Sequence, residues 1–430
     1  MPPFPSLSLS RRKLLQSGSA AALSTLLPQR FLPTGWGAET PEKKLPVAAV
    51  VSVYHTNSHA DVIVGKILEG FRQDGGAGPA LQLVSLFADQ HPASDLSRKL
   101  GETHAFRLAR SINEALTLGT DKLQVAGVLS IGEHGDYPFT PETKQHMYPR
   151  RRFFDEIVAT FRRCGASVPV FNDKHLSYRW DDAKSMYDTA RTMRFPFLAG
   201  SSVPVAWRYP AVELSRECEI EAALSIGYGG FEAYGFHALE GHQAMIERRR
   251  GGETGVASVQ AVTKAAIRRT QEEGAWSKEL FAAALATLPG QLQDTGTWSE
   301  TGDSAVYLVQ HRDGLRSAVV MANGLAGQFA FATKLKGVKE PVTTWFKLQE
   351  VAPFGHFAYL VRAIEQTFRT GREAYPVERT LLTSGILDRV MQSLAQEGKL
   401  LETPELAISY RAADWPFANR DDSPLTLPND

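Results

Sequence analysis

Ionisable side chains follow four apolar stretches of the sequence, each where the apolar run ends. Imidazole, carboxylate and ammonium groups carry out proton transfer and ligand binding in proteins. If the four runs are neighbouring strands, their ends meet at one edge of one sheet, and this many ionisable groups there predict a functional site. The residues are Tyr54, His55 and His59 after the first run, Asp89 after the second, Glu133, His134, Asp136 and Tyr137 after the third, and Asp173, Lys174 and His175 after the fourth.

Two of these histidines have a spacing that suits metal binding. His55 and His59 are four residues apart, so a helix would place them on one face. Imidazole and carboxylate groups are ligands of divalent metals. A metal site at His55, His59, Glu133 and His134, with Asp61 and His175 nearby, is therefore one possibility.

The elements that carry these groups alternate between strand and helix. Continuous apolar, β-branched runs indicate strands buried on both faces, and amphipathic segments between them indicate helices. Such alternation predicts a doubly wound parallel sheet, in which ligands bind beyond the carboxyl ends of the strands. The expected strands are 45–54, 81–90, 126–133, 168–173 and 196–202, and the expected helices are 58–75, about 93–101, 150–165 and 180–195.

The pattern changes after about residue 205. Two alternating runs joined through Asp313-Gly314 predict a hairpin, and further strands are expected at 256–262, 327–337 and 341–350. We expect a large, mostly antiparallel sheet with one face covered by helices 236–249 and 356–371, and a closing helix at 377–398. The predicted organisation is a signal and linker at 1–45, a first domain at 46–205, an α+β domain at 206–410 and an irregular tail at 411–430.

The N-terminus has the layout of an export signal. Arg11 and Arg12 precede a short run rich in Ala, Leu and Ser, as in a signal peptide with a charged and an apolar region. The stretch "SRRKLLQ" resembles the twin-arginine signal, whose cargo is exported folded. The run is too short for a stable membrane anchor. We expect a periplasmic or otherwise extracytoplasmic protein, with cleavage near Ala38.

The net charge limits the kinds of binding partner that we expect, and the two cysteines leave two possibilities open. Lys+Arg 47 against Asp+Glu 47 gives a formal charge of zero, so no global basic field exists to attract nucleic acid or anionic lipid. Small molecules and protein surfaces are the expected partners. Cys164 and Cys218 could pair or remain two buried thiols, and their spacing fits no metal motif.

Three local matches make the chain resemble the Gfo/Idh/MocA family of sugar and polyol oxidoreductases. "NDKHLSYRWDDAKSMYD" stands where that family has Glu-Lys-Pro before a helix, with Asp173-Lys174 for Glu-Lys and His175 for the proline. "AYGFHALEGHQAM" matches Asp-x-Gly-x-His-x-x-Asp at Gly235, His237 and Glu240, but has Ala233 for the first acid. The segment from His356 resembles the family's closing segment. The resemblance implies a Rossmann-like first domain.

The resemblance also implies a reaction. In this family a nicotinamide, here expected to be NAD, takes a hydride from a sugar carbinol while a nearby base accepts the hydroxyl proton. Lys174 takes the place of the catalytic lysine, whose ammonium polarises the oxygen and orients a proton relay. His237 is the expected proton shuttle, with Asp173 and His175 beside it.

The first turn departs from the family's dinucleotide fingerprint. Glycines normally let the backbone approach the pyrophosphate, but Gly-x-Gly-x-x-Gly/Ala falls on "HTNSHA" and gives His55, Asn57 and Ala60. Asn tolerates left-handed backbone and Ala fits the third place, whereas His55 has no such property. Asp89 fits the acid that binds a ribose diol and favours NAD over NADP. Glu133 and His134 complete the expected cofactor-binding group.

Two alternatives follow from this departure. One is a nicotinamide-free, metal-dependent sugar lyase, hydrolase or isomerase on the same fold; the other is a non-catalytic sugar-binding relative, because Ala233 removes an expected polar group. For the substrate pocket we expect Tyr148, from a loop that could form a lid, and Trp207, Arg208 and His356 from the second domain. We expect a homo-oligomer formed through the broad second sheet.

Overall fold

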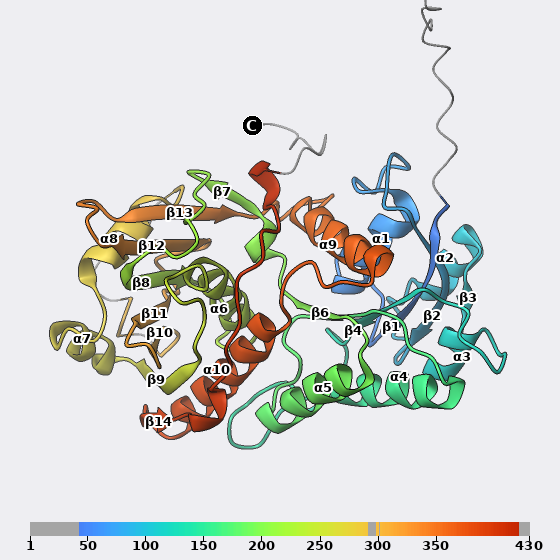
Figure 1. Cartoon of the computed structure of the whole chain (residues 1–430), viewed down its shortest axis with the longest axis horizontal. Coiled ribbons are helices and arrows are strands. Elements are labelled where there is room, and N and C mark those ends of the chain that lie inside the picture. The colour runs from blue at the N-terminus through green and yellow to red at the C-terminus, as the bar shows by residue number, and fades with distance from the viewer. Residues whose placement is uncertain (1–42, 291–297, 301, 421–430) are drawn as a thin grey trace, which may run out of the picture. The chain divides into compact units, whose positions relative to one another are not determined.

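The computed structural model describes residues 43–290, 298–300 and 302–420 (Figure 1). The predicted export signal at 1–42 and the last part of the tail, 421–430, lie outside the described residues. Among the helices that are described, none has the length and apolar character needed to cross a membrane. Cys164 and Cys218 are both free thiols.

The first sheet has six parallel strands in the order β3-β2-β1-β4-β5-β6. β1 lies between β2 and β4, so the strand order reverses there, and the polar residues that follow β1 and β4 flank this switch point. The strands are β1 (Leu45–Val51), β2 (Leu81–Ala88), β3 (Arg107–Leu108), β4 (Gly127–Ile131), β5 (Val170–Asp173) and β6 (Phe197–Gly200).

Helices cover both faces of this sheet. Ala48 and Val50 of β1 pack in one apolar cluster with α3, α4 and α5, whereas Val47, Ala49 and Val51 pack in another with α1 and α9. Burial on both faces explains the continuous apolar run of β1. The helices are α1 (His59–Glu69), α2 (Ser97–His104), α3 (Ile112–Thr117), α4 (Arg150–Cys164), α5 (Trp180–Met193) and α9 (His356–Thr370).

The second sheet has eight strands in the order β14-β9-β10-β11-β8-β12-β13-β7. All its pairs are antiparallel except β8 with β11, and the predicted hairpin joins β10 to β11. The predicted fold class is therefore confirmed. The strands are β7 (Trp207–Tyr209), β8 (Ile220–Gly227), β9 (Val256–Thr263), β10 (Ala305–His311), β11 (Arg316–Met321), β12 (Phe329–Leu335), β13 (Val342–Lys347) and β14 (Leu401–Glu402).

The helices around the second sheet correct one expectation. α6 (Ala233–Ile246) and α10 (Glu378–Ala395) cover one face, as predicted for the first of them. α9 does not: it packs on α1 of the first sheet, as Figure 1 shows, because Leu360 and Ile364 join the apolar cluster of Ile63. α8 (Lys278–Ala286) covers part of the other face, and α7 (Ala265–Glu272) contacts β9. Short 3-10 turns are η1 (Val203–Val205), η2 (Pro404–Leu406) and η3 (Ala418–Arg420).

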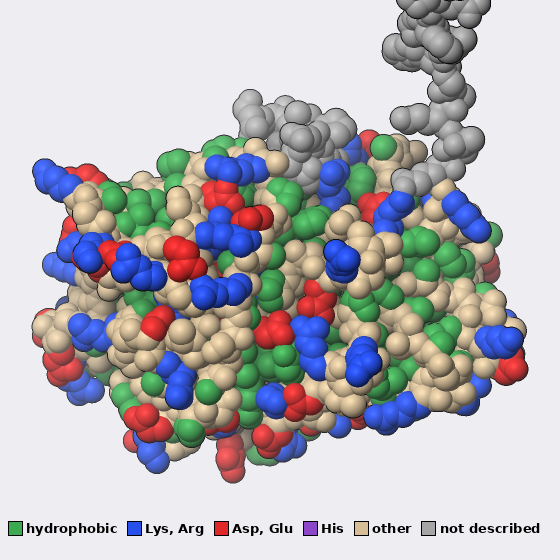
Figure 2. Space-filling view, viewed as in Figure 1, with side chains coloured by type: hydrophobic (Ala, Val, Ile, Leu, Met, Phe, Trp, Pro, Cys, Tyr) green, Lys and Arg blue, Asp and Glu red, His purple; other side chains and the backbone are tan. Residues whose placement is uncertain are grey.

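Charged side chains of both signs are interspersed over the face seen in Figure 2. Many of the charges are paired; Arg191, for example, binds Glu373 at 2.6 Å and Glu378 at 2.9 Å. This mixed surface agrees with the formal charge of zero.

Candidate functional site

The carboxyl ends of β1, β4 and β5 bring most of the predicted residues together. Lys174 directly follows β5 and has a positive φ of 65°, a conformation that its neighbours stabilise. Its backbone N–H donates to Gly200 O at 3.1 Å. The Asn172 amide also donates to the carbonyls of Asp173 and His175, at 3.2 and 3.1 Å. The turn after β5 is thus held by its own strand end and by β6.

A buried ion-pair group lies at this edge. Lys174 Nζ donates to Glu133 Oε1 at 2.8 Å, and Arg150 Nη2 donates to Glu133 Oε2 at 2.5 Å. All three side chains are at most 7% exposed. Burial alone would raise the pKa of the Glu133 carboxyl, but the charges of Lys174 and Arg150 hold it well below its ordinary value. Glu133 is therefore a fixed anion that orients the lysine.

A histidine–carboxylate pair stands beside it. His59, the first residue of α1, places Nδ1 2.7 Å from Asp173 Oδ2, and Asp173 is 1% exposed. A carboxylate on Nδ1 fixes the imidazole with Nε2 as the nitrogen that can accept a proton. The ring centroid of His59 lies 5.8 Å from that of His134 and 6.3 Å from that of His237. Sequence reasoning placed His59 at this edge of the sheet but gave it a role only in the metal alternative, because the partner carboxylate is 114 residues away.

His237 comes to the same group from α6 of the second sheet. Its Nδ1 lies 2.6 Å from Ser201 Oγ. Burial, and then the charge of Lys174, lower the pKa of His237 well below its ordinary value. His237 is thus a neutral imidazole at neutral pH, and it does not titrate there as expected from its residue type alone.

His175 is buried below the carboxyl edge of the first sheet, between Arg150 and Phe236. Its Nε2 is 3.0 Å from Arg150 Nη1, its ring packs against Phe236, and the side chain is 3% exposed. Burial, and then the charge of Arg150, lower the pKa of His175 well below its ordinary value. His175 therefore helps to position Arg150, which in turn binds Glu133.

Glu232 is a site residue that the motif comparison missed. It is the N-cap residue of α6, one position before Ala233, where the resemblance expects an acid. Glu232 Oε2 accepts the backbone N–H of His146 at 2.7 Å, and Oε1 is buried without a hydrogen bond. Burial raises the pKa of Glu232 to about 7. The motif expects an acidic residue at position 233, and the sequence has one at the preceding position, Glu232.

We expect Glu232→Gln to change the pH dependence of stability. Because its pKa is raised, Glu232 keeps its proton in the folded protein up to about pH 7, whereas the unfolded chain loses that proton near pH 4.3. The free energy of unfolding of the wild type therefore falls as pH rises from about 4.3 to about 7. Between these pH values, the free energy of unfolding of the variant should rise by on the order of 1–3 kcal/mol relative to that of the wild type. Urea unfolding across the pH range measures this. The exposed Glu272→Gln is the control, and parallel curves for wild type and Glu232→Gln would refute the assignment.

The first turn is closed by its own side chains. Asn57 has φ 63°, as its residue type allows, and its N–H donates to Asp61 Oδ2 at 2.8 Å. The hydroxyl of Ser58 accepts the N–H groups of His55 and Asp61, at 3.3 and 3.2 Å. Ala60 is buried in the α1 cluster. A pyrophosphate at this helix end would meet the Asp61 carboxylate, and side chains in place of glycine.

Asp89 stands where a ribose-binding acid is expected, directly after β2. Asp89 Oδ2 accepts both the Tyr137 hydroxyl, at 2.7 Å, and Arg152 Nη2, at 2.6 Å. Its other oxygen takes part in neither contact. An acid here suits a ribose diol, whereas the arginine beside it suits a 2′-phosphate.

The fit to a nicotinamide dinucleotide is therefore divided. Asp89 suits the adenosine ribose. The first turn does not suit the pyrophosphate, because Asp61 and Ser58 already accept the backbone N–H groups of this turn. His134, with its ring 5.2 Å from that of His55, lies over the same turn.

The metal alternative receives no support from the geometry. Over 43–290 and the later described segments, no three His, Cys, Asp or Glu side chains are arranged to hold a metal ion. The physical reason lies in existing partners: Glu133 binds Lys174 and Arg150, His59 binds Asp173, and His55 Nδ1 lies 2.9 Å from Thr56 O.

The four expected substrate residues separate into two groups. Tyr148 stacks on His146 at 3.9 Å and lies under the Arg150 guanidinium, and His356 packs on Phe357, which contacts His59. These two border the site. Trp207 instead packs on Tyr359, and Arg208 contacts Pro204, Val212 and Phe417, so neither makes a contact with the ionisable group.

Comparison with known proteins supports the fold. Neither a protein-family model nor a curated protein matches the sequence. Solved structures do match: apo scyllo-inositol dehydrogenase from Lactobacillus casei has a TM-score of 0.52 at 9% identity, covering 84% of this chain and 98% of that one. A putative myo-inositol dehydrogenase from Sinorhizobium meliloti 1021 has a TM-score of 0.52 at 12% identity, with 84% and 99% covered.

GenD2 from gentamicin A biosynthesis, in complex with NAD, has a TM-score of 0.53 at 13% identity, covering 84% of this chain and 96% of that one. At these identities the likeness shows the fold. The resemblance to Gfo/Idh/MocA oxidoreductases is thus confirmed at the level of the fold.

Proposed function

We propose that the protein is an enzyme, an oxidoreductase that acts on a hydroxyl group of a sugar or polyol. The observation that carries the proposal is Lys174, buried against the fixed anion Glu133, with the His59–Asp173 pair beside it. Perturbed, mutually oriented acids and bases at the carboxyl edge of such a sheet are typical of active sites. The dehydrogenase folds found by comparison support hydride transfer as the reaction class.

In the proposed mechanism the chain's own residues handle the proton. The Lys174 side chain donates a hydrogen bond to the substrate oxygen, and its ion pair with Glu133 orients it. His59 Nε2 accepts the hydroxyl proton, and Asp173 stabilises the resulting imidazolium. Neutral His237 and the protonated form of Glu232 are hydrogen-bonding groups for neighbouring hydroxyls. NAD, when bound, would supply the hydride acceptor.

A second candidate is a nicotinamide-free isomerase or lyase, and the closed first turn favours it. Because Asp61 and Ser58 bind the amides that would hold a pyrophosphate, the same lysine and histidine would work alone. They could move a proton next to a carbonyl, with Lys174 stabilising the developing enolate oxygen.

Calorimetric titration with NAD⁺, NADH, NADP⁺ and NADPH separates the candidates. Saturable binding that weakens at least tenfold in Asp89→Ala supports the oxidoreductase. No binding at millimolar cofactor, combined with proton exchange at a sugar carbon followed by NMR, supports the nicotinamide-free enzyme. If neither is seen but a sugar binds, the chain is a non-catalytic sugar-binding relative.

Asp173→Asn tests the His59–Asp173 pair. The amide keeps the size of Asp173 but can hold the wrong imidazole tautomer and cannot stabilise the imidazolium, so we expect kcat to fall by about 10²–10⁴-fold. Steady-state assays over a polyol panel measure the loss. Asp188→Asn, on the exposed surface of α5 beside Lys184, is the matched control and should keep full activity. Equal turnover in both variants would contradict the role.

Two further expectations remain proposals. Export by the twin-arginine route is tested by cell fractionation of Arg11→Lys, Arg12→Lys double variants, which should retain the chain in the cytoplasm. Assembly into a homo-oligomer is tested by light scattering; α8 covers part of the sheet face expected at the interface.

A further inference from the structure

A small polar cavity lies between β7, the ends of α6 and α10, and the C-terminal described residues. Its volume is about 30 Å³, and its lining includes none of the residues assigned to the proposed site. Six side chains supply the polar lining: Arg208, Arg248 and Arg379, Glu213 and Glu247, and Tyr375. Apolar side chains, including Phe417, complete it.

The charges around this cavity do not balance. Arg379 binds Glu247 through two nitrogens, at 2.8 and 2.5 Å, and Arg248 binds Glu213 at 3.3 Å. Arg208 makes no ion pair with any residue that the structure describes. Three cations thus face two anions, and Arg208 is the cation left over.

One neighbouring acid, Asp414, does not correct the imbalance, because it already serves a further arginine, and so does Glu213 of the lining. Asp414 lies 3.4 Å from Arg248 but 2.7 Å from Arg216, and Glu213 also binds Arg420.

The unpaired cation is buried. Arg208 is 6% exposed, and its guanidinium stacks on Phe417 at 4.1 Å while two of its nitrogens donate to the carbonyls of Pro204 and Val212. Burial, and then the charge of Arg379, lower the pKa of Arg208 to about 9, which still leaves it protonated at neutral pH. A buried charge without a counter-charge is costly.

Two hydrogen-bond donors of the lining also lack partners. Arg208 Nε and the Tyr375 hydroxyl are both buried, and neither has a hydrogen bond to a described residue. Burial raises the pKa of Tyr375, so its hydroxyl stays a donor. Each unsatisfied buried group has a desolvation cost, and two donors on one cavity beside an unpaired cation point to one shared acceptor.

We propose that this cavity binds a single small monovalent anion of the size of chloride, held by Arg208 and Tyr375. A cavity volume of roughly 10–15 Å³ holds one water molecule. A cavity of about 30 Å³ therefore admits a halide ion but excludes a sugar or a nucleotide. The anion supplies the missing counter-charge and accepts from the two donors. Bound there, it links Arg208 of β7 to Tyr375, which lies in the segment between α9 and α10.

Thermal unfolding tests the proposal without reference to enzymatic activity. At matched ionic strength, sodium chloride should raise the Tm above that in sodium gluconate, whose anion is too large, by about 2–5 °C with saturation. Crystals grown with bromide should show an anomalous peak between Arg208 and Tyr375. Equal Tm values in the two salts, or a cavity without a bromide peak, would overturn the proposal.

Variants locate the effect. Tyr375→Phe removes only the hydroxyl and should weaken the chloride-dependent rise by at least half, and Arg208→Met should abolish it. Arg312→Met, at an exposed position, is the control and should keep the full rise. If Arg208→Met does not fold, Tyr375→Phe still decides: a full chloride effect in that variant contradicts the site.

Discussion

Replacement of Lys174 by methionine should lower kcat by about 10²–10⁴-fold on every polyol that the wild type turns over, because it removes the group that we propose holds the substrate oxygen. The fold should persist, since Glu133 keeps its ion pair with Arg150 and is not left as an isolated buried charge. Steady-state kinetics with NAD⁺ and myo-inositol as the first probe, followed by other polyols, provide the measurement.

The matched control for this variant is Lys184→Met. Lys184 lies on α5, ten residues beyond Lys174, but it is 38% exposed; its ammonium binds Asp188 in the next turn and lies 5.9 Å from the Tyr187 ring centroid. Its replacement should leave both kcat and KM unchanged. Wild-type turnover in Lys174→Met would remove the lysine from the mechanism, whereas equal losses in both variants would indicate a general effect on the protein.

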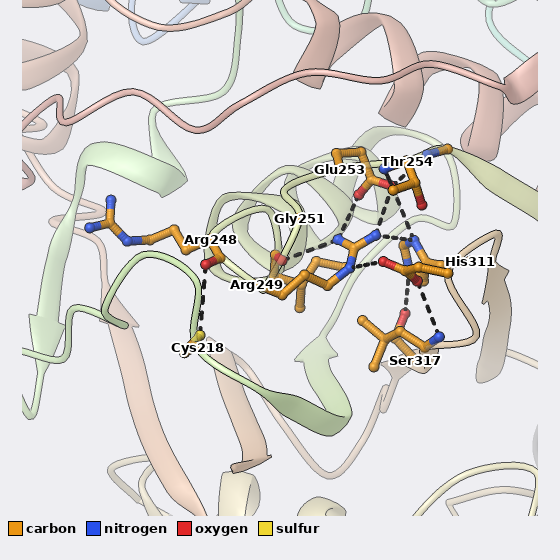
Figure 3. A network of polar contacts seen from close by, with 12 residues as sticks. Cys218, Arg248, Arg249, Gly251, Glu253, Thr254, His311 and Ser317 are labelled. Atoms are coloured by element: carbon orange, nitrogen blue, oxygen red, sulfur yellow. Dashed lines mark hydrogen bonds and ion pairs between the residues drawn. The ribbon is translucent and has the colours of Figure 1, made fainter. Parts of the chain in front are cut away.

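The largest expected effect on stability is that of Glu253→Gln. Glu253 is buried and belongs to the network in Figure 3, in which Arg249 donates to both of its oxygens at 2.9 Å. The backbone N–H groups of Thr254 and Gly255 also donate to it, at 2.9 and 2.8 Å. Loss of one partner of a buried ion pair costs about 3–5 kcal/mol, so the free energy of unfolding should fall by that amount. Urea denaturation at neutral pH measures it.

The same residue predicts acid sensitivity. Burial raises the pKa of Glu253, but His311 and Arg249 outweigh it and hold the pKa far below the ordinary value. A depressed carboxyl pKa stabilises the fold above the unfolded value of about 4.3, and this contribution is lost as pH falls below it. Wild type should therefore lose stability below about pH 4.3 more steeply than Glu253→Gln.

The exposed pair of Glu221 and Lys334 supplies the control. Glu221→Gln should change the free energy of unfolding by no more than about 1 kcal/mol, because water screens such pairs. A similar small change in Glu253→Gln would show that the buried network contributes little.

The elements and their order could be predicted well where periodicity was strong. β1, β4 and β5 were visible as apolar runs, and the hairpin through Asp313-Gly314 was visible from its turn residues. Short elements such as β3 and β7 were missed, because two or three residues carry no period. The helix from His356 was assigned to the wrong sheet, since its amphipathic pattern requires an apolar partner but does not say which one.

The site was predicted as a set of residues but not as a set of pairs. Strand ends told us that Glu133, Asp173 and Lys174 would meet, yet the roles of His59 and Glu232 depended on partners distant in sequence. Glu232 was overlooked because the motif comparison looked only at position 233. Arg208 was expected at the substrate and instead lies buried beside Phe417.

By itself, therefore, the sequence determined the alternation of strands and helices and the edge at which the ionisable groups collect, because hydrophobic periodicity and strand ends are local properties. Only the tertiary structure decided which of those groups are paired, neutral or charged. Hydrogen-bond partners and pKa values depend on burial and on distances between segments such as α1 and β5, whose residues His59 and Asp173 lie 114 positions apart in the chain and 2.7 Å apart in the fold.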